Sequence, residues 1–324
     1  MTPTGHPPSR IGFVVKALGR PGLKSNDARR WQSGPHLRVS LGYLNATFDY
    51  LAETEIRMYR VSSDIAPYAT HPDLPQFHHQ LEECVDELRD LAEKRARLDL
   101  RLSMHPGQYI VLNSPDERIV AASIRDFAFQ TAFLDALNCG PEAKIITHVG
   151  GVYGDRQSAM DRFVRRHHDL TPEVQRRLVL ENDEISYSVP DVLAIHARTG
   201  IPIVFDILHH RVSNPAGWSE AEACRNCLAT WPTGQIPKIH YSTQRAVDRE
   251  IVRKSRLTGE TETRSAPPKA GQHDDWIDSE DFIAFIRSVD SPPFDVMLEA
   301  KQKDLALLKL RTAITAAGLS DRIW

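Results

Sequence analysis

The sequence of 324 residues predicts an α/β fold, a single (β/α)8 TIM barrel that forms one domain over residues 1–324. Eight short runs, apolar or alternating between apolar and polar residues, recur along the chain, and helix-like segments separate most of them. Repeated alternation of strand and helix indicates a parallel sheet. The length suits one closed barrel of ~250 residues with insertions. An open, doubly wound sheet is the alternative that this pattern leaves open.

The predicted strands are short, and in chain order they cover residues 11–15, 57–62, 98–105, 144–150, 177–183, 201–207, 237–242 and 294–301. The third run shows the strand period most clearly, because Leu100, Leu102 and Met104 occupy every second position. It stops abruptly at His105, before a Pro-Gly pair that turns the chain.

Four segments between these runs have the apolar spacing of helices, and they cover residues 78–98, 118–137, 188–200 and 279–289. In the first of them, Leu81, Cys84 and Leu88 form one stripe. Gly200 closes the third segment as a C-terminal glycine, and Ser279 is expected to cap the fourth.

Two segments fall outside this rhythm. Residues 1–10 are polar and rich in proline, so we expect a loose N-terminal arm. Residues 245–275 form a long insertion in the loop after the seventh strand. Residues 245–269 hold seven Lys or Arg against four Asp or Glu. The insertion is therefore either a solvated surface loop or a basic loop that meets an anionic ligand at the barrel mouth.

Composition narrows the class of protein. Hydrophobic residues make up 41% of the chain and charged residues 26%, which is ordinary for a soluble globular protein. Neither a membrane-spanning run nor the apolar core of a signal peptide is evident, so we expect a cytoplasmic protein, associated with the nucleoid in a prokaryote. The net charge of −3 argues against a nucleic-acid-binding surface, unless carboxylates are neutralised by bound metal.

The four cysteines do not indicate a disulfide scaffold, given the size of the chain. Cys224 and Cys227 form a C-x-x-C pair in a helix-like segment, without a second such pair or a nearby pair of histidines. We interpret them as two small helix residues rather than zinc ligands or a redox pair.

Polar side chains lie at or just beyond the ends of six successive predicted strands: His105, His148, Glu181, Asp206, His209, His240 and Glu299. In a barrel, the C-terminal ends of all strands meet at the face that carries the active site. Imidazole and carboxylate ligands suit Zn²⁺, Mn²⁺ or Fe²⁺. Because one ion needs fewer ligands, the sequence predicts two or three ions that share bridging carboxylates.

Lys238 lies two residues before His240, so both side chains point to the same side of their strand. An ammonium group beside metal ions is electrostatically unfavourable. Lys238 must therefore pair with a carboxylate such as Glu181, lose its proton or be chemically modified, and the sequence leaves all three open. A cluster of this kind fits hydrolysis of a phosphodiester and also aldose–ketose isomerisation, between which the fold cannot choose.

Six blocks of sequence carry a resemblance to a known family: "LSMHPGQYIVLNSPD", "HVGGVYGD", "LENDE", "DILHH", "PKIHYSTQ" and "DVMLEAK". In this order, from about residue 57 to 301, they resemble the UV damage endonuclease family. The resemblance implies a barrel of the apurinic endonuclease and xylose isomerase type. It also implies a metal-dependent DNA repair endonuclease that nicks double-stranded DNA on the 5′ side of UV photoproducts and other lesions such as abasic sites.

The resemblance implies metal ligands at His71, His105, His148, Glu181, Asp206, His209, His240, His273 and Glu299, with Lys238 as a further ligand when its amine is carboxylated. Of these, His273 is matched only by its position after the long insertion. The catalytic set would be Glu181, Lys238, His240 and Glu299. Two or three divalent ions are implied, with Mn²⁺ favoured and Zn²⁺ or Mg²⁺ as alternatives.

For DNA, the resemblance implies that Gln108 and Tyr109 probe the lesion, together with Phe13, which stands where the family has a tyrosine. Candidate phosphate contacts are Lys16, Arg20, Arg211 and the basic loop 245–269. The expected partner is damaged double-stranded DNA, with no membrane, no obligatory protein partner and a monomeric state. A metal-dependent sugar isomerase and a non-catalytic lesion-binding protein are the rival hypotheses.

Overall fold

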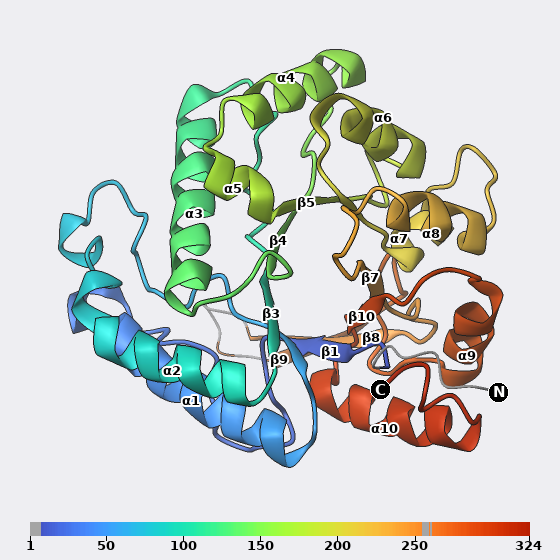
Figure 1. The fold of residues 1–324 in the computed structure, drawn as a ribbon, viewed down its shortest axis with the longest axis horizontal. Coiled ribbons are helices and arrows are strands. Elements are labelled where there is room, and N and C mark those ends of the chain that lie inside the picture. The colour runs from blue at the N-terminus through green and yellow to red at the C-terminus, as the bar shows by residue number, and fades with distance from the viewer. Residues whose placement is uncertain (1–7, 255–258, 260) are drawn as a thin grey trace.

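The computed structural model describes residues 8–254, 259 and 261–324. Eight parallel strands form a nearly closed barrel, and helices surround it (Figure 1). The strands are β1 (Ile11–Val14), β2 (Met58–Arg60), β3 (Arg101–Met104), β4 (Lys144–Thr147), β5 (Leu178–Glu181), β6 (Ile203–Val204), β7 (Lys238–Tyr241) and β10 (Asp295–Leu298). Each lies inside one of the eight predicted runs, so the barrel prediction is confirmed and the open sheet was the wrong alternative.

Seven lateral pairings are regular, in the order β6-β5-β4-β3-β2-β1-β10-β7. The remaining gap, between β6 and β7, is bridged by one parallel pair, Asp206 and His240, where His240 N donates to Phe205 O at 2.9 Å. The first and last barrel strands in the sequence, β1 and β10, are therefore neighbours inside the sheet.

The helices are α1 (Leu37–Glu53), α2 (Val85–Arg97), α3 (Glu117–Ala136), α4 (Arg156–His168), α5 (Pro172–Arg177), α6 (Val189–Thr199), α7 (Ile207–Val212), α8 (Glu220–Leu228), α9 (Ser279–Ser288) and α10 (Lys303–Ala316). Three of the four predicted helices agree within one residue at each end. The predicted helix 78–98 is shorter, because residues 78–84 form turns and a 3₁₀ segment (Glu82–Cys84) before α2 begins.

Local capping explains the helix ends. At α6, Ser188 and Asp191 form a capping box, and Gly200 ends the helix with φ +72°, as predicted. The cap of α9 is Asp278 rather than Ser279, because the Asp278 carboxylate accepts from the backbone N–H of Glu280 and of Asp281. Cys224 and Cys227 are buried free thiols on α8, as interpreted from the sequence.

Charged side chains enter the barrel interior as well as apolar ones. Arg101 on β3 forms a buried ion pair with Asp295 on β10 at 2.6 Å. Because β3 and β10 are not neighbours in the sheet, this contact crosses the interior. On β3 and β10, residues two positions apart point the same way, so the strands that hold this pair also carry polar side chains towards their C-terminal ends.

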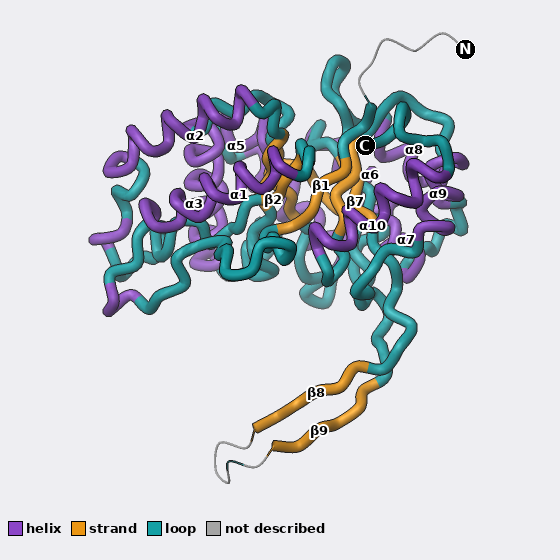
Figure 2. The backbone as a smooth tube through the Cα atoms, turned by 90° about the horizontal axis from the view of Figure 1, so that it is seen from below, coloured by secondary structure: helices purple, strands orange, loops and turns teal. Residues whose placement is uncertain are grey.

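The insertion after β7 forms a two-stranded antiparallel hairpin, β8 (Arg249–Lys254) and β9 (Thr261–Ala266), rather than an irregular loop. Figure 2 shows it leaving the body of the barrel. Its base is fixed at the mouth, where Arg245 N donates to Gln272 O at 2.8 Å and Gln244 pairs with His273.

The loose-arm prediction concerned residues 1–10, of which 1–7 lie outside the described residues. The rest of the arm is anchored, which corrects the prediction there. Ser9 exchanges backbone hydrogen bonds with the C-terminal residues, and Arg10 N donates to the Asp295 carboxylate at 2.7 Å. In the part of the chain that the structure describes, no helix combines the length and the apolar character needed to cross a membrane.

Candidate metal centre

The strand ends bring together three groups of possible metal ligands, each with ligand atoms within 4.8 Å of one another. They are His105 with His148 and Glu181, Glu181 with Asp206 and His209, and Asp206 with His240 and Glu299. Glu181 belongs to two groups and Asp206 to two. The three groups are therefore one continuous cluster, as expected for ions that share bridging carboxylates.

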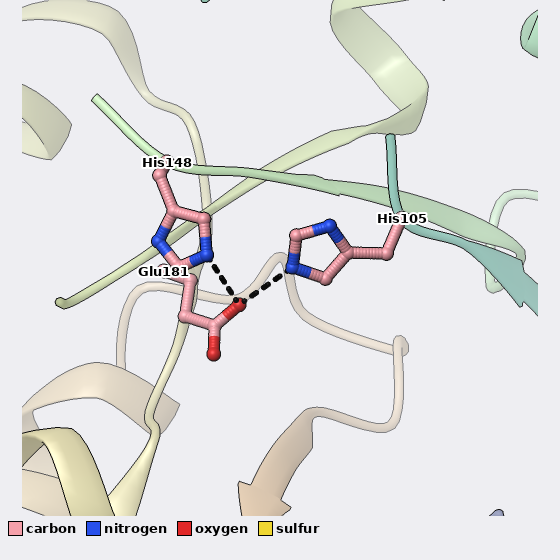
Figure 3. A group of neighbouring side chains, drawn as sticks. All are labelled: His105, His148 and Glu181. Carbon is pink, nitrogen blue, oxygen red and sulfur yellow. Dashed lines mark hydrogen bonds and ion pairs between the residues drawn. The ribbon is translucent and has the colours of Figure 1, made fainter. Parts of the chain in front are cut away.

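Glu181, at the end of β5, lies at the centre of this cluster. One carboxylate oxygen, Oε2, lies 3.2 Å from His105 Nε2 and 3.5 Å from His148 Nε2 (Figure 3). The other, Oε1, lies 2.7 Å from His240 Nδ1. The side chain is almost completely buried. One carboxylate thus contacts imidazoles from three other strand ends.

Asn182 fixes the next two ligands. Its side-chain amide donates to Asp206 O at 3.0 Å and accepts from Asp206 N at 2.9 Å. Asp206 caps α7 by accepting from His209 N at 2.8 Å, and His209 Nδ1 lies 2.9 Å from Asn182 O. With Nδ1 donating to this carbonyl, Nε2 of His209 is the atom left for a ligand. The sequence shows Asn182 only as the middle of "LENDE", and its role needed the fold.

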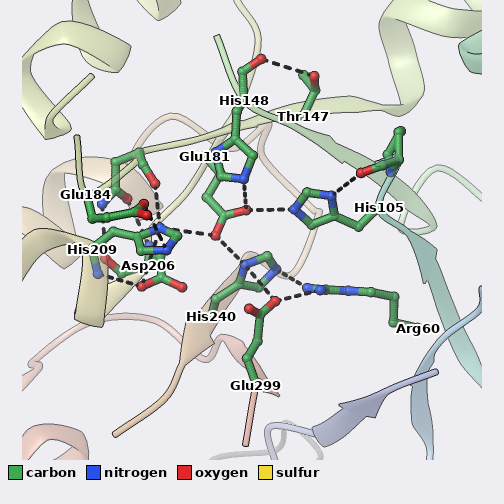
Figure 4. A network of polar contacts seen from close by, with 12 residues as sticks. Arg60, His105, Thr147, His148, Glu181, Glu184, Asp206, His209, His240 and Glu299 are labelled. Atoms are coloured by element: carbon green, nitrogen blue, oxygen red, sulfur yellow. Dashed lines mark hydrogen bonds and ion pairs between the residues drawn. The ribbon is translucent and has the colours of Figure 1, made fainter. Parts of the chain in front are cut away.

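Arg60 is a member of the site that sequence reasoning missed. Its guanidinium donates to Glu299 Oε1 at 2.5 Å and lies 2.7 Å from His240 Nε2 (Figure 4). Arg60 is buried at the end of β2. The sequence does offer a signal, which is a charged residue inside a short predicted strand. Because such a charge is buried only with a partner, Arg60 indicates an ion pair in the barrel.

The predicted ligands are placed as follows. His273 joins the cluster, with Nδ1 3.8 Å from Glu299 Oε2 and its ring 6.4 Å from that of His209. His71 lies apart: it is exposed on the loop after β2, and its Nδ1 accepts from Asp73 N at 3.2 Å. Within the described residues, no contact joins His71 to the cluster, so its role as a ligand stays a prediction.

Burial sets the protonation of the ligands. It raises the pKa of Glu181 well above the ordinary value, and the charges of Glu299 and Asp206 raise it further. Burial lowers the pKa of His105 and of His240, and nearby Arg60 adds to both shifts. For Glu299, burial opposes ionisation, but the positive charge of Arg60 holds the pKa well below the ordinary value. Burial thus favours neutral imidazoles at His105 and His240, the form that binds metal. At His209 burial opposes the charged form, but the charges of Asp206 and Glu184 raise its pKa above the ordinary value.

Several buried polar atoms in the cluster have no hydrogen-bond partner among the described residues, and Asp206 Oδ2 and His148 Nδ1 are two of them. A buried carboxylate oxygen without a partner is costly, and a cation removes that cost. Together with the nitrogen and oxygen donor set, these atoms fit divalent metal ions.

Lys238 is buried beneath the cluster, and its Nζ also lacks a partner in the part of the chain that the structure describes. Burial lowers the pKa of the Lys238 amine well below the ordinary value, and the charges of Arg60 and Arg101 lower it further. Since neither Glu181 nor another described carboxylate forms an ion pair with this amine, the salt-bridge alternative for Lys238 is wrong in this structure. Loss of the proton and chemical modification remain.

A cleft of about 380 Å³ opens above these groups. His105, His148 and His209 form part of its wall, and Gln108 lies at its edge. Beside Gln108, Tyr109 is 79% exposed. The turn after β3 thus places an amide and an aromatic ring at the rim of the cleft, a few residues from a metal ligand.

Three other predicted DNA contacts, Phe13, Arg20 and Arg211, pack against or pair with other residues of the protein. Phe13 is fully buried and packs edge-on against Tyr59, with ring centroids 5.3 Å apart, so the prediction that it faces DNA is corrected. Arg20 forms an ion pair with Glu53. Arg211 is held by Glu220 and Asp281 at 2.6 and 2.7 Å.

Lys16 is exposed and, within the described residues, forms no ion pair. Arg20 and Arg211 differ from it in forming internal ion pairs, and the role of all three as phosphate contacts stays a prediction.

Comparison with known proteins agrees with this geometry. A sequence model of the family described as UV-endonuclease UvdE matches residues 40–320. A UV DNA damage endonuclease from Clostridium perfringens is 32% identical over 84% of this chain and 61% of its own length, so the chain spans less than two thirds of that relative. One from Bacillus velezensis is 34% identical over 83% of this chain and 78% of its own length.

Solved structures show the same relation. The crystal structure of SacUVDE is 32% identical, with a TM-score of 0.81 over 96% of this chain and 99% of that one. Endonuclease IV from Thermus thermophilus, 11% identical with a TM-score of 0.55 over 95% of this chain and 99% of that one, shares the fold. So does an L-ribulose 3-epimerase, 15% identical with a TM-score of 0.58 over 96% of this chain and 94% of that one.

Proposed function

Because this chain belongs to the UV-endonuclease UvdE family, we propose that it is a metal-dependent DNA repair endonuclease. It nicks damaged double-stranded DNA on the 5′ side of UV photoproducts and of other lesions such as abasic sites. The observation that carries the proposal is the continuous ligand cluster at the barrel mouth, in which Glu181 and Asp206 each belong to two ligand groups.

The cluster supports cleavage of a phosphodiester. Two or three divalent ions, with Mn²⁺ proposed, would supply a water of lowered pKa and stabilise the leaving oxygen. Glu181 and Asp206 would hold the shared positions, and the ligand set would be completed by His105, His148, His209, His240 and Glu299. His71 and His273 are proposed as further ligands. Arg60 keeps Glu299 ionised for its role as a ligand.

Lys238 is proposed to be carboxylated. Its amine is deeply buried, without a partner among the described residues and with a lowered pKa, so it holds the free electron pair that attacks the carbon of CO₂. As the nitrogen–carbon bond forms, one C=O π bond of CO₂ breaks and its electron pair moves to oxygen, one proton passes from the nitrogen to water, and the product is a carbamate anion. The carbamate oxygens would then be able to hold the divalent ions, which a protonated amine could not.

The substrate would approach over the rim. Gln108 and Tyr109 are proposed to test the duplex for a step that opens easily, because an aromatic ring and an amide can replace lost stacking and hydrogen bonds. Lys16 and the hairpin after β7 are proposed to contact phosphates on either side. The enzyme would act as a monomer in the cytoplasm, on the nucleoid, without an obligatory protein partner.

A sugar isomerase is less well supported. The epimerases that resemble this chain share its fold at low identity, and an exposed aromatic rim has no use in a pocket that closes over a small sugar.

The test compares supercoiled plasmid before and after ultraviolet irradiation, with the protein in Mn²⁺ or in chelator. The proposal expects nicking of irradiated plasmid alone, and only with metal. Equal nicking of both plasmids, or none with metal present, would refute it.

A further inference from the structure

Three successive loops at the barrel mouth, after β3, β4 and β5, are joined into one unit. Asn113, from the loop after β3, donates to Gly151 O at 2.8 Å, and Tyr187 Oη, from the loop after β5, donates to the same carbonyl at 3.1 Å. Asn113 and Tyr187 are both fully buried. This junction holds the loops in fixed relation without any metal ligand taking part.

The loop after β5 is further fixed by Asp183. Its Oδ1 accepts hydrogen bonds from the backbone N–H of Ile185 at 2.8 Å, of Ser186, and of Tyr187 at 3.1 Å. Asp183 N in turn donates to Tyr187 O at 2.9 Å. The turn at Ile185 is therefore rigid before any ligand binds.

This rigid turn presents an apolar side chain to solvent. Ile185 is 79% exposed, the same fraction as Tyr109 on the loop after β3. Tyr153, on the loop between them in the sheet order, is also exposed. One exposed apolar residue is common, but three on adjoining loops, one of which lines the cleft above the metal centre, are typical of a contact surface.

The cleft relates Ile185 to the metal centre. Ile185 lines the same cleft as Gln108, His105 and His148. The side chain has no hydrogen-bonding group, so it cannot read the edges of bases. It can fill the space left when a base pair is unstacked, as apolar wedges do in proteins that kink DNA. A turn that is already fixed loses little entropy when it takes up this position.

We propose that Ile185 is a second wedge, which enters the duplex from the loop after β5 and holds open the damaged step beside Gln108 and Tyr109. Gln108 supplies hydrogen bonds, Tyr109 supplies stacking, and Ile185 supplies apolar filling. The proposal rests on the proposed endonuclease function and adds a residue that determines lesion specificity.

The experiment uses Ile185→Ala and the matched control Ile236→Ala, which removes an exposed isoleucine just before β7, at the opposite end of the barrel. Each variant and the wild type cut two duplexes with the same photoproduct. In one the opposite strand is fully paired, and in the other the bases opposite the lesion are mismatched, so that the step is already open. Metal content and melting temperature are measured for each variant.

A role in opening predicts that Ile185→Ala loses about tenfold in kcat/KM on the paired duplex and recovers most of this on the mismatched one. Metal content should stay at the wild-type level, and Ile236→Ala should match the wild type. Unchanged cutting of the paired duplex overturns the proposal, and so does an equal loss on both duplexes. A wild type that cuts neither duplex would instead refute the endonuclease function itself.

Discussion

His240 Nδ1 lies 2.7 Å from Glu181 Oε1, and both side chains are buried. The two residues come from β7 and β5, which lie on either side of β6 in the closed barrel, so this contact joins two strand ends across that of β6. Burial raises the pKa of Glu181 and lowers that of His240, so it favours the uncharged form of each group. Since a metal ion binds the ionised carboxylate, metal binding competes with protonation of Glu181.

The Glu181→Gln variant removes this charge and keeps the shape of the side chain. We expect metal affinity to fall by about a hundredfold or more. Mutation of a residue that only hydrogen-bonds to a metal ligand already lowers metal affinity roughly 10- to 100-fold. Nicking should be lost in parallel. Metal titration followed by calorimetry checks this, with Glu173→Gln on the exposed side of α5 as the control. Wild-type affinity in Glu181→Gln would show that Glu181 is not a shared ligand.

Replacing Arg60 by methionine should lower the free energy of unfolding, because it leaves a buried carboxylate without its partner. Glu299 would lose the guanidinium that keeps it ionised, and breaking a buried ion pair costs about 3 kcal/mol in unfolding free energy. Bound metal should restore part of this loss. Urea unfolding with and without metal measures both effects.

Arg57→Met, at an exposed position just before β2, provides the control for Arg60. If the metal-loaded Arg60→Met protein is destabilised as much as the metal-free one, the guanidinium does not act through Glu299.

The sequence predicted the barrel and most of the cluster because both follow from periodicity and position. Eight runs with strand spacing imply the fold, and the fold places every strand end at one face. The role of Arg60 was not predicted because it depends on contacts across the barrel with residues of β7 and of the end of β10, which no local sequence pattern encodes. The hairpin after β7 was not predicted because neither of its strands shows alternating apolar residues: β8 has only the adjacent Ile251 and Val252, and β9 is polar apart from Ala266.

The prediction that Phe13 faces DNA was wrong for a related reason. Resemblance at one position cannot say which way a strand-end side chain points, and here it packs against Tyr59.

Tyr109→Ala should separate lesion recognition from metal binding. The exposed ring touches no ligand within the described residues, so metal content and melting temperature should match the wild type, while the preference for damaged over undamaged duplex falls about tenfold. Binding to both duplexes, measured by fluorescence anisotropy, tests this. Loss of metal in Tyr109→Ala would contradict the division of roles along the turn after β3.

We expect the stability of the fold to depend on pH through Asp126, a residue outside the metal centre. Burial raises its pKa to about 6, the hydrogen bond from Gln130 opposes the shift, and Asp64 adds to it. A carboxyl group with a raised pKa in the folded state stabilises the fold fully below its unfolded pKa, and this contribution is lost as pH rises through about 6.

Asp126→Asn imitates the protonated group, so its stability relative to the wild type should rise between about pH 4 and pH 7, by about 1 to 2 kcal/mol. Thermal unfolding across this range checks the sign, and Asp86→Asn, at an exposed position of α2, should show no such trend. If the wild type instead becomes more stable relative to Asp126→Asn as pH rises, the raised pKa of Asp126 is contradicted.

The most direct test of the central claim uses a duplex with a single defined photoproduct, labelled at the 5′ end of the damaged strand. The products of the wild type and of Glu181→Gln are mapped to the nucleotide, in Mn²⁺ and in chelator. We expect one metal-dependent cut on the 5′ side of the lesion by the wild type alone. Cuts with no fixed relation to the lesion, cutting in chelator, or an active Glu181→Gln would contradict it.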